Sequence, residues 1–268
     1  MKLQTTVEIK PSAWKIGYDD KILLLGSCFS DSIGQIMSMR ELQVTSNPFG
    51  TLYNPLSIAK ALELKEVPEL VEFKGLWHSM AHHGSFSRPT KEETLAAVQA
   101  SIDAMQEAFN QANVVIITFG TAWIYERNGE VVGNCHKLPA SDFTRRRLTV
   151  DEIVQTWMSI IEKHPDKRWL FTVSPIRHIK DGLHENQLSK ATLLQAVEQL
   201  GDYFPSYEIV LDELRDYRFY SDDLVHPSPI AINYVWERFV ETYCTPQTQN
   251  EMNIRLKKWK FAHHISLH

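Results

Sequence analysis

Short apolar runs recur along the chain and are separated by stretches with helical spacing. The runs are rich in Val, Ile, Leu and Phe, and they cover Ile22–Leu25, Val114–Phe119, Trp169–Val173 and Tyr207–Leu211. Continuous runs of this length are typical of parallel strands that are covered on both faces. Residues 1–10 instead alternate between apolar and polar positions, which is the pattern of a further strand.

Helical patterns lie between these runs. The sequence predicts helices over Asp31–Leu42, Lys91–Asn110, Val150–Lys163, Asn186–Leu200 and from Ser228 to about Tyr243. Thr90 and Thr149 each open a capping box, because a glutamate stands three residues later. Ser228-Pro229 suits the first positions of the last helix. The alternation predicts an α/β fold: a doubly wound, mostly parallel sheet in a three-layer α/β/α sandwich.

Two stretches interrupt this alternation. Leu70–Ser87 contains several histidines with little helical character, and Trp123–Val132 predicts a hairpin that turns at Asn128-Gly129. Both begin close to predicted strand ends. We therefore interpret them as loop and hairpin insertions that flank a site, and residues 1–268 as a single domain of ordinary size for a three-layer fold.

The composition narrows the class of protein. Hydrophobic residues make up 43% and charged residues 23% of the chain, as in soluble globular proteins. The net charge of −5 argues against a nucleic-acid partner, and the basic cluster Arg145–Arg147 is interpreted as a solvated loop. No apolar run approaches the roughly 20 residues of a membrane span. Residues 1–10 lack the apolar segment of a signal peptide, and three cysteines make no disulfide framework, which favours the cytoplasm.

The first apolar run leads directly into Gly26-Ser27-Cys28. A buried strand that ends in Gly-Ser and continues as a helix can present one hydroxyl at the edge of a sheet. Near the other end of the chain, Asp223 and His226 stand three residues apart. A nucleophilic serine needs a base, and the base needs an orienting carboxylate. The sequence therefore predicts a nucleophile, an acid and a base at Ser27, Asp223 and His226.

Each of these residues also has a simpler interpretation. Ser27 suits the N-cap of the following helix, and the adjacent aspartates suit a turn. Cys28 is chemically the better nucleophile. Consecutive residues at such a turn point in different directions, however, and a cysteine beside an apolar strand is more often a packing residue. Asp222 is the rival of Asp223 as the orienting acid.

Four motifs stand in order along the chain, and these are Leu25–Phe29, Asn47–Pro55, Asn134–Pro139 and Val225–Pro227. In sequence and order they resemble the GSCFA family, which is grouped with the SGNH (GDSL-like) hydrolases. The resemblance runs from about Thr5 to Tyr243. It implies a flavodoxin-like fold and a triad in which Asp223 is the acid. It also implies that the N–H groups of Ser27 and Gly50 bind an oxyanion, and that the enzyme needs no cofactor.

One element departs from the SGNH pattern. Those enzymes carry Gly-x-Asn after a central strand, whereas Ala122 stands at the asparagine position here. Loss of one oxyanion donor costs roughly 10²–10³ in rate. The residues considered as a replacement donor are Thr121, Asn134 and His136, and His136 is favoured because an imidazole can donate from either nitrogen. The residues considered as further substrate contacts are His83, Arg177 and His178. Arg177 suits either an anionic group on a substrate or a structural ion pair.

These observations favour a serine esterase that forms an acyl-enzyme on a small-molecule or carbohydrate ester. An acyltransferase with the same triad is a close variant. The alternative from another class is a binding protein that keeps the fold without efficient chemistry, as Ala122 suggests. No metal is expected, because no histidine spacing matches a zinc motif, and no glycine-rich phosphate loop follows the first strand.

Overall fold

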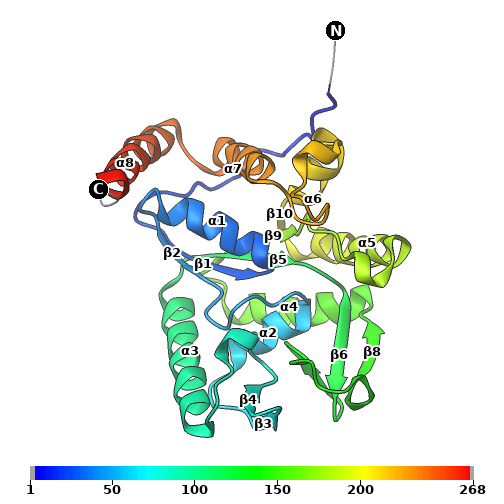
Figure 1. The fold of residues 1–268 in the computed structure, drawn as a ribbon. Coiled ribbons are helices and arrows are strands. Elements are labelled where there is room, and N and C mark those ends of the chain that lie inside the picture. Colours follow the sequence, from blue (N-terminus) through cyan, green and yellow to red (C-terminus); the bar gives the residue numbers. More distant parts are fainter. Residues whose placement is uncertain (1–3, 266–268) are drawn as a thin grey trace.

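A five-stranded sheet with the order β10-β9-β5-β1-β2 runs through the centre of the molecule (Figure 1). The computed structural model describes residues 4–265. The strands are β1 (Lys21–Gly26), β2 (Gln43–Ser46), β5 (Val114–Phe119), β9 (Arg168–Val173) and β10 (Asp202–Phe204), and every neighbouring pair is parallel. The chain moves outward from β1 to β2 and then returns to build the other half from β5. The strand order therefore reverses between β1 and β5, and ligand sites in such sheets lie outside the carboxyl ends at this point.

Alternate residues of the strands build two apolar layers. Leu23 and Leu25 pack below α2 (Pro55–Glu63), α3 (Lys91–Gln111), α4 (Val150–Lys163) and α5 (Leu183–Leu200). Ile22 and Leu24 face the opposite layer, with α1 (Cys28–Ser38), α7 (Pro229–Tyr243), α8 (Pro246–Ile265) and the turn Ile209–Glu213 that follows α6 (Ser206–Glu208). Figure 1 shows α1 and α7 on one side of the sheet and α2, α3 and α4 on the other. The predicted three-layer α/β/α fold is thus confirmed.

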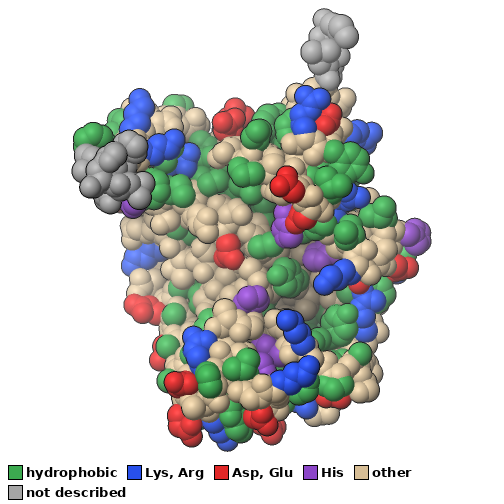
Figure 2. All heavy atoms as spheres, in the orientation of Figure 1, with side chains coloured by type: hydrophobic (Ala, Val, Ile, Leu, Met, Phe, Trp, Pro, Cys, Tyr) green, Lys and Arg blue, Asp and Glu red, His purple; other side chains and the backbone are tan. Residues whose placement is uncertain are grey.

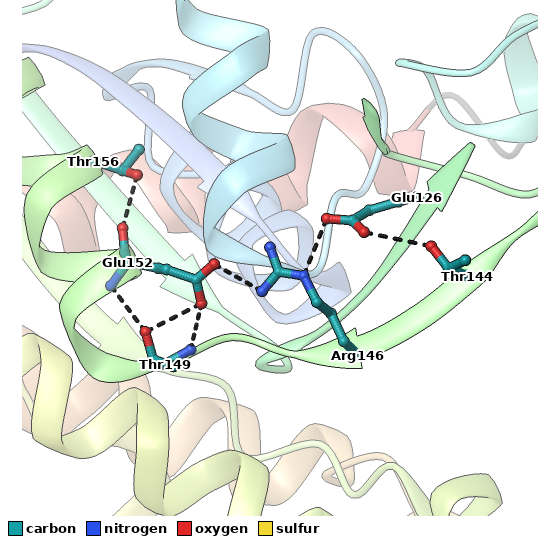
Figure 3. A network of polar contacts seen from close by, with 6 residues as sticks. All are labelled: Glu126, Thr144, Arg146, Thr149, Glu152 and Thr156. Carbon is teal, nitrogen blue, oxygen red and sulfur yellow. Dashed lines mark hydrogen bonds and ion pairs between the residues drawn. The ribbon is translucent and has the colours of Figure 1, made fainter. Parts of the chain in front are cut away.

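The predicted insertions form two small antiparallel sheets. One contains β3 (Leu70–Phe73) and β4 (Leu76–Ser79), and the other contains β6 (Trp123–Arg127), β7 (Glu130–Val132) and β8 (Thr144–Arg147). The basic cluster is therefore a strand and not a loop. Arg146 joins this sheet to α4, because its guanidinium binds both Glu126 and Glu152 (Figure 3). Glu152 also completes the predicted capping box at Thr149.

Two predicted strands are wrong. Tyr207–Leu211 lies in a helical segment made of α6 and a wider turn over Ile209–Glu213, whereas the fifth strand is the short β10 just before it. Periodicity cannot separate a short buried helix from a buried strand, and here both bury apolar side chains. Residues 4–10 form no strand, and residues 1–3 lie outside the described part of the chain.

Several elements left no clear signal in the sequence. These are β2, α2 and α8, together with the short helical turns Gly84–Phe86, Ala140–Asp142, Ile179–Asp181 and Tyr217–Phe219. The first helix also begins earlier than predicted, at Cys28, because the Ser27 side chain caps it. The three cysteines Cys28, Cys135 and Cys244 are free thiols. Within residues 4–265, no helix combines the length and the apolar character needed to cross a bilayer.

Candidate active site

The turn between β1 and α1 holds Ser27 at the edge of the sheet. Gly26 has a φ of 138°, and a side chain there would clash with the Thr118 carbonyl of β5. Ser27 follows and is 1% exposed. Its Oγ accepts a hydrogen bond from the Phe29 N–H at 3.3 Å, so Ser27 does cap the helix. Among the described residues nothing accepts the hydroxyl proton, so capping leaves that proton for a base.

Asn47 fixes this turn from the neighbouring loop. Its Oδ1 accepts a hydrogen bond from the Gly26 N–H at 2.8 Å, and its Nδ2 donates to Asp31 on α1 at 2.7 Å. Its own N–H donates to the Leu24 carbonyl at 2.9 Å. Burial raises the pKa of Asp31, while the Asn47 hydrogen bond and the charge of His83 oppose that rise. In the sequence, Asn47 stands out only as part of a motif, and no pattern predicts the role of its side chain.

Asp223 and His226 form the predicted acid–base pair on the loop before α7. The His226 Nδ1 lies 2.6 Å from the Asp223 Oδ2, and the Asp223 Oδ1 accepts the N–H groups of Val225 and His226. These hydrogen bonds lower the pKa of Asp223 to about 2. The ionised carboxylate holds the proton of the imidazole on Nδ1 and leaves Nε2 as the acceptor. Asp222 makes no comparable contact within the described chain.

The two halves of the site lie at the same edge without a direct hydrogen bond between Ser27 and His226 in the described residues. Burial raises the pKa of the Cys28 thiol, and the charges of Asp31 and Asp223 raise it further. The Arg177 N–H, just after the carboxyl end of β9, donates to the Val225 carbonyl, which places the loop at this edge. Asp223 and His226 have side chains that are 50% and 47% exposed, whereas Ser27 is buried. Proton transfer thus requires the imidazole to approach the serine.

The two predicted oxyanion donors are both engaged. The Gly50 N–H donates to the Asn47 carbonyl at 2.7 Å, and the Ser27 N–H donates to the Thr118 carbonyl at 3.4 Å. The second bond is long and weak. Gly50 is required for another reason: its φ is 74°, and a side chain there would clash with His83. The prediction that the Gly50 amide is open to substrate is therefore not met in this conformation.

The replacement donors predicted from the sequence also have other partners. Thr121 Oγ1 lies 3.1 Å from the Ser189 hydroxyl on α5, and the Ala122 N–H donates to the same hydroxyl. Ala122 is fully buried. The segment is fixed against the preceding loop, because the N–H groups of Gly120 and Thr121 both donate to the Tyr53 carbonyl. The Thr121 hydroxyl is thus engaged with α5 in this structure.

His136 is likewise tied to the insertion. Its Nε2 lies 2.8 Å from the Ser79 carbonyl, and its ring stacks on His78 with centroids 4.6 Å apart. Burial lowers the pKa of His136 to about 4, and the Ser79 hydrogen bond opposes this. The neutral ring has one N–H, which the Ser79 carbonyl occupies, so His136 is not the missing donor. Asn134 Oδ1 accepts the His136 N–H and so belongs to the same turn.

His83 and His178 border the site. His83 Nδ1 accepts the Ser85 N–H at 3.2 Å, so in the neutral ring Nε2 carries the proton. Burial lowers the pKa of His178 to about 4, the charges of Lys190 and His226 lower it further, and a hydrogen bond to the Gly120 carbonyl opposes them. The buried His178 Nε2 has no partner in the described structure. The ring meets Tyr53 edge-on at 6.1 Å. Figure 2 shows histidine side chains gathered along the middle of this face.

Lys190 is the least expected residue near the site. It is 1% exposed, and its Nζ donates to the carbonyls of Gly120 and Ser174, each at 2.7 Å. These two residues directly follow β5 and β9, so the lysine joins the carboxyl ends of the two strands. Burial lowers the pKa of Lys190 to about 7. The sequence contained a signal, because Lys190 stands on the apolar face of the predicted helix with Leu193 and Val197.

Comparison with known proteins identifies the family. The sequence profile of the GSCFA family matches residues 21–239. The chain belongs to the GSCFA family. No curated protein matches it. A solved structure from Desulfitobacterium hafniense DCB-2, assigned to the lipolytic G-D-S-L family, aligns with a TM-score of 0.43 and 11% identity over 84% of this chain and 99% of that chain. A likeness at this level carries no argument about function.

Several residues in and directly after the first motif of this GSCFA protein have structural roles. Gly26 lets β1 approach β5, and Ser27 caps α1. Phe29 is buried in the layer beneath α7. Ser30 donates to Thr118 Oγ1 at 2.7 Å, which ties the first turn of α1 to β5. Among the side chains that the structure describes, no group of three or more His, Cys, Asp or Glu could hold a metal ion.

Proposed function

We propose that this GSCFA protein is a serine esterase with Ser27, His226 and Asp223 as its triad. The observation that carries the proposal is the 2.6 Å pair of Asp223 and His226, beside the edge of the sheet that holds Ser27. Family membership supports it, because the matched region includes all three residues. The unshared hydroxyl proton of Ser27 and the open Nε2 of His226 are the two groups that general-base catalysis needs.

The reaction follows from these groups. His226 Nε2 takes the Ser27 proton as Oγ bonds to the acyl carbon, and then gives the proton to the departing alcohol as the ester C–O bond breaks. Water repeats the cycle on the acyl-enzyme and releases the acid. Asp223, whose pKa is about 2, stays ionised and stabilises the imidazolium. The positive end of the α1 dipole, which begins at Cys28 directly after Ser27, stabilises the oxyanion.

We propose a small-molecule or carbohydrate ester as the substrate. An acyltransferase would use the same steps, with an acceptor alcohol in place of water in the second half. Arg145 lies over the Trp123 ring at 3.9 Å, so one face of this tryptophan is already covered and does not support sugar stacking.

Labelling with a fluorophosphonate probe tests the assignment of the nucleophile. The probe should modify the wild-type protein and the Cys28→Ala variant, and Ser27→Ala should abolish the modification. Cys28 is the matched neighbour, because it is the first residue of α1 and its thiol is only partly buried. Labelling that disappears in the Cys28 variant and persists in Ser27→Ala would reverse the assignment.

A binding protein is the second candidate, and two observations favour it. The Gly50 amide is committed to the Asn47 carbonyl, and Ser27 is almost completely buried. Both features would suit a fold that has kept its turn without its chemistry. Absence of labelling in the folded wild-type protein, together with no turnover of acetyl esters, would decide for this candidate.

A further inference from the structure

A separate cavity lies next to the loop that carries Asp223 and His226. Its volume is about 300 Å³, and its lining includes the side chains of Arg177, Tyr207, Tyr217 and Tyr220. This volume stands at the lower end of the range for ligand sites. It would accept a single ring with its substituents, and it would not accept a long acyl chain. Apolar side chains from α5 and from the turn after α6 complete the walls.

The cavity shares its structure with the candidate catalytic loop. The Arg177 N–H donates to the Val225 carbonyl, and its Nη1 donates to the Leu224 carbonyl, both at 3.2 Å. Tyr220 pairs with Pro227 as an isolated bridge. A ligand in the cavity would therefore lie against the segment that holds His226.

Arg177 is the unmatched charge of this cavity. Of the other charged residues in the lining, Arg215 pairs with Asp212 at 2.8 Å, and Asp216 pairs with Arg218 at 3.0 Å. Arg177 forms no ion pair in the described structure. Its guanidinium lies 5.9 Å from the Tyr217 ring and 5.6 Å from the Tyr220 ring. The structural ion pair considered from the sequence is therefore absent within residues 4–265.

A guanidinium in this position suits an anionic group. It has five N–H donors, of which the Leu224 carbonyl takes one in the described structure. Carboxylates and phosphates match the planar donor arrangement of arginine, and tyrosine rings suit the face of a bound ring. We propose that this cavity binds a ring that carries a carboxylate or a phosphate, so that the substrates are esters of acidic, ring-sized molecules. The assignment of this anion as part of a substrate rests on the proposed esterase function, whereas the binding of the anion does not.

Calorimetric titration with benzoate, phenyl phosphate and benzyl alcohol tests the binding without any catalysis. At least one anion should bind, and benzyl alcohol should bind at least tenfold more weakly. The stronger of the two anions identifies the charged group. Arg177→Gln should weaken anion binding about tenfold or more, and Arg177→Lys, which keeps the charge, should restore part of it. Arg255→Gln is the matched control. Arg255 is on α8, its guanidinium also lies over a tyrosine ring, that of Tyr18, and its loss changes the net charge equally.

Hydrolysis of phenyl acetate and 4-acetoxybenzoate links the cavity to the reaction. The wild type should prefer the carboxylate ester in kcat/KM by about tenfold, and Arg177→Gln should remove the preference. Binding of both anions no tighter than that of benzyl alcohol, or unchanged binding of the stronger anion in Arg177→Gln, would overturn the proposal. Benzoate binding through Arg177 without hydrolysis of either ester would refute the esterase and keep the anion site. Hydrolysis without any preference in either protein would refute the anionic substrate and keep the esterase.

Discussion

The Ser27 turn is buried at the end of β1, whereas the Asp223–His226 loop lies on the surface. Asn47, Asp31 and the strands on both sides fix the turn by hydrogen bonds. The loop is held by backbone contacts to Arg177 and by the hydrogen bonds within the Asp223–His226 pair. The side of the candidate site that holds Ser27 is therefore part of the core, and the side that holds His226 is a surface loop attached to it.

This difference separates stability from activity. A buried side chain that caps a helix contributes to both folding and chemistry, whereas a half-exposed histidine on a loop contributes mainly to chemistry. Substitutions on the two sides should therefore give different pairs of readouts.

The largest effects are expected for Ser27→Ala and His226→Gln. Each should lower kcat on a model acetyl ester by roughly 10³–10⁴-fold, because each removes one member of the triad. Ser27→Ala should also lower the free energy of unfolding by about 1 kcal/mol, since it removes the helix cap. His226→Gln should leave the unfolding free energy within about 0.5 kcal/mol of the wild type.

Steady-state kinetics and urea unfolding on the same preparations check this pair. If His226→Gln lowers the free energy of unfolding as much as Ser27→Ala does, the loop is a structural element and the proposed difference between the two sides of the site is wrong. If both variants keep wild-type turnover, the triad itself is wrong.

The same contrast explains how much of the fold the sequence predicts. β1, β5 and β9 are covered on both faces, so each is a continuous apolar run. β2 and β10 lie at the sheet edges, are only three or four residues long and are partly exposed, so they leave no such run. A buried helical segment after β10 then has the stronger apolar signal and is taken for the strand.

The candidate site divides in the same way. Asp223 and His226 are close in sequence, so their spacing suggests a pair, and the resemblance to the SGNH enzymes favours Asp223 over Asp222. The roles of Asn47 and Lys190 depend on partners that are 21 and 70 residues away, and no local pattern specifies them. The sequence favours His136 as a donor because an imidazole can donate from either nitrogen, but the adjacent hairpin supplies the Ser79 carbonyl that occupies its Nε2.

Asn47→Ala should give the largest loss of stability without removal of a triad residue. The substitution leaves the Gly26 N–H buried without its acceptor, which costs about 1–3 kcal/mol. Asn47 also has a φ of 44°, and an alanine there adds about 1 kcal/mol of strain. We expect the unfolding free energy, measured in urea, to fall by about 3 kcal/mol.

Asn128→Ala is the matched control for Asn47→Ala. Asn128 has a similar φ of 53°, but it is exposed at the hairpin turn. The Asn128→Ala variant should lose only the stability that comes from backbone strain at a positive φ, about 1 kcal/mol. Equal losses in the two variants would show that the side-chain bridge between Gly26 and Asp31 adds nothing to stability.

The smallest expected effect is a pH dependence that comes from Lys190, which lies beneath the buried side of the site. Its folded-state pKa is about 7, and its ordinary value is 10.5. Below pH 7 both states hold the proton, whereas between these values the unfolded chain keeps a proton that the folded protein has released. Stability should therefore rise with pH through this window, by about 1 kcal/mol between pH 6.5 and 8.

The Lys190→Met variant tests this pH dependence. Its absolute stability changes at every pH, because the Gly120 and Ser174 carbonyls lose their donor, but the rise in stability that comes from Lys190 should disappear. Urea unfolding of the wild type and of Lys190→Met at the two pH values checks this, and a wild-type slope in Lys190→Met would mean that the buried lysine releases no proton in this range.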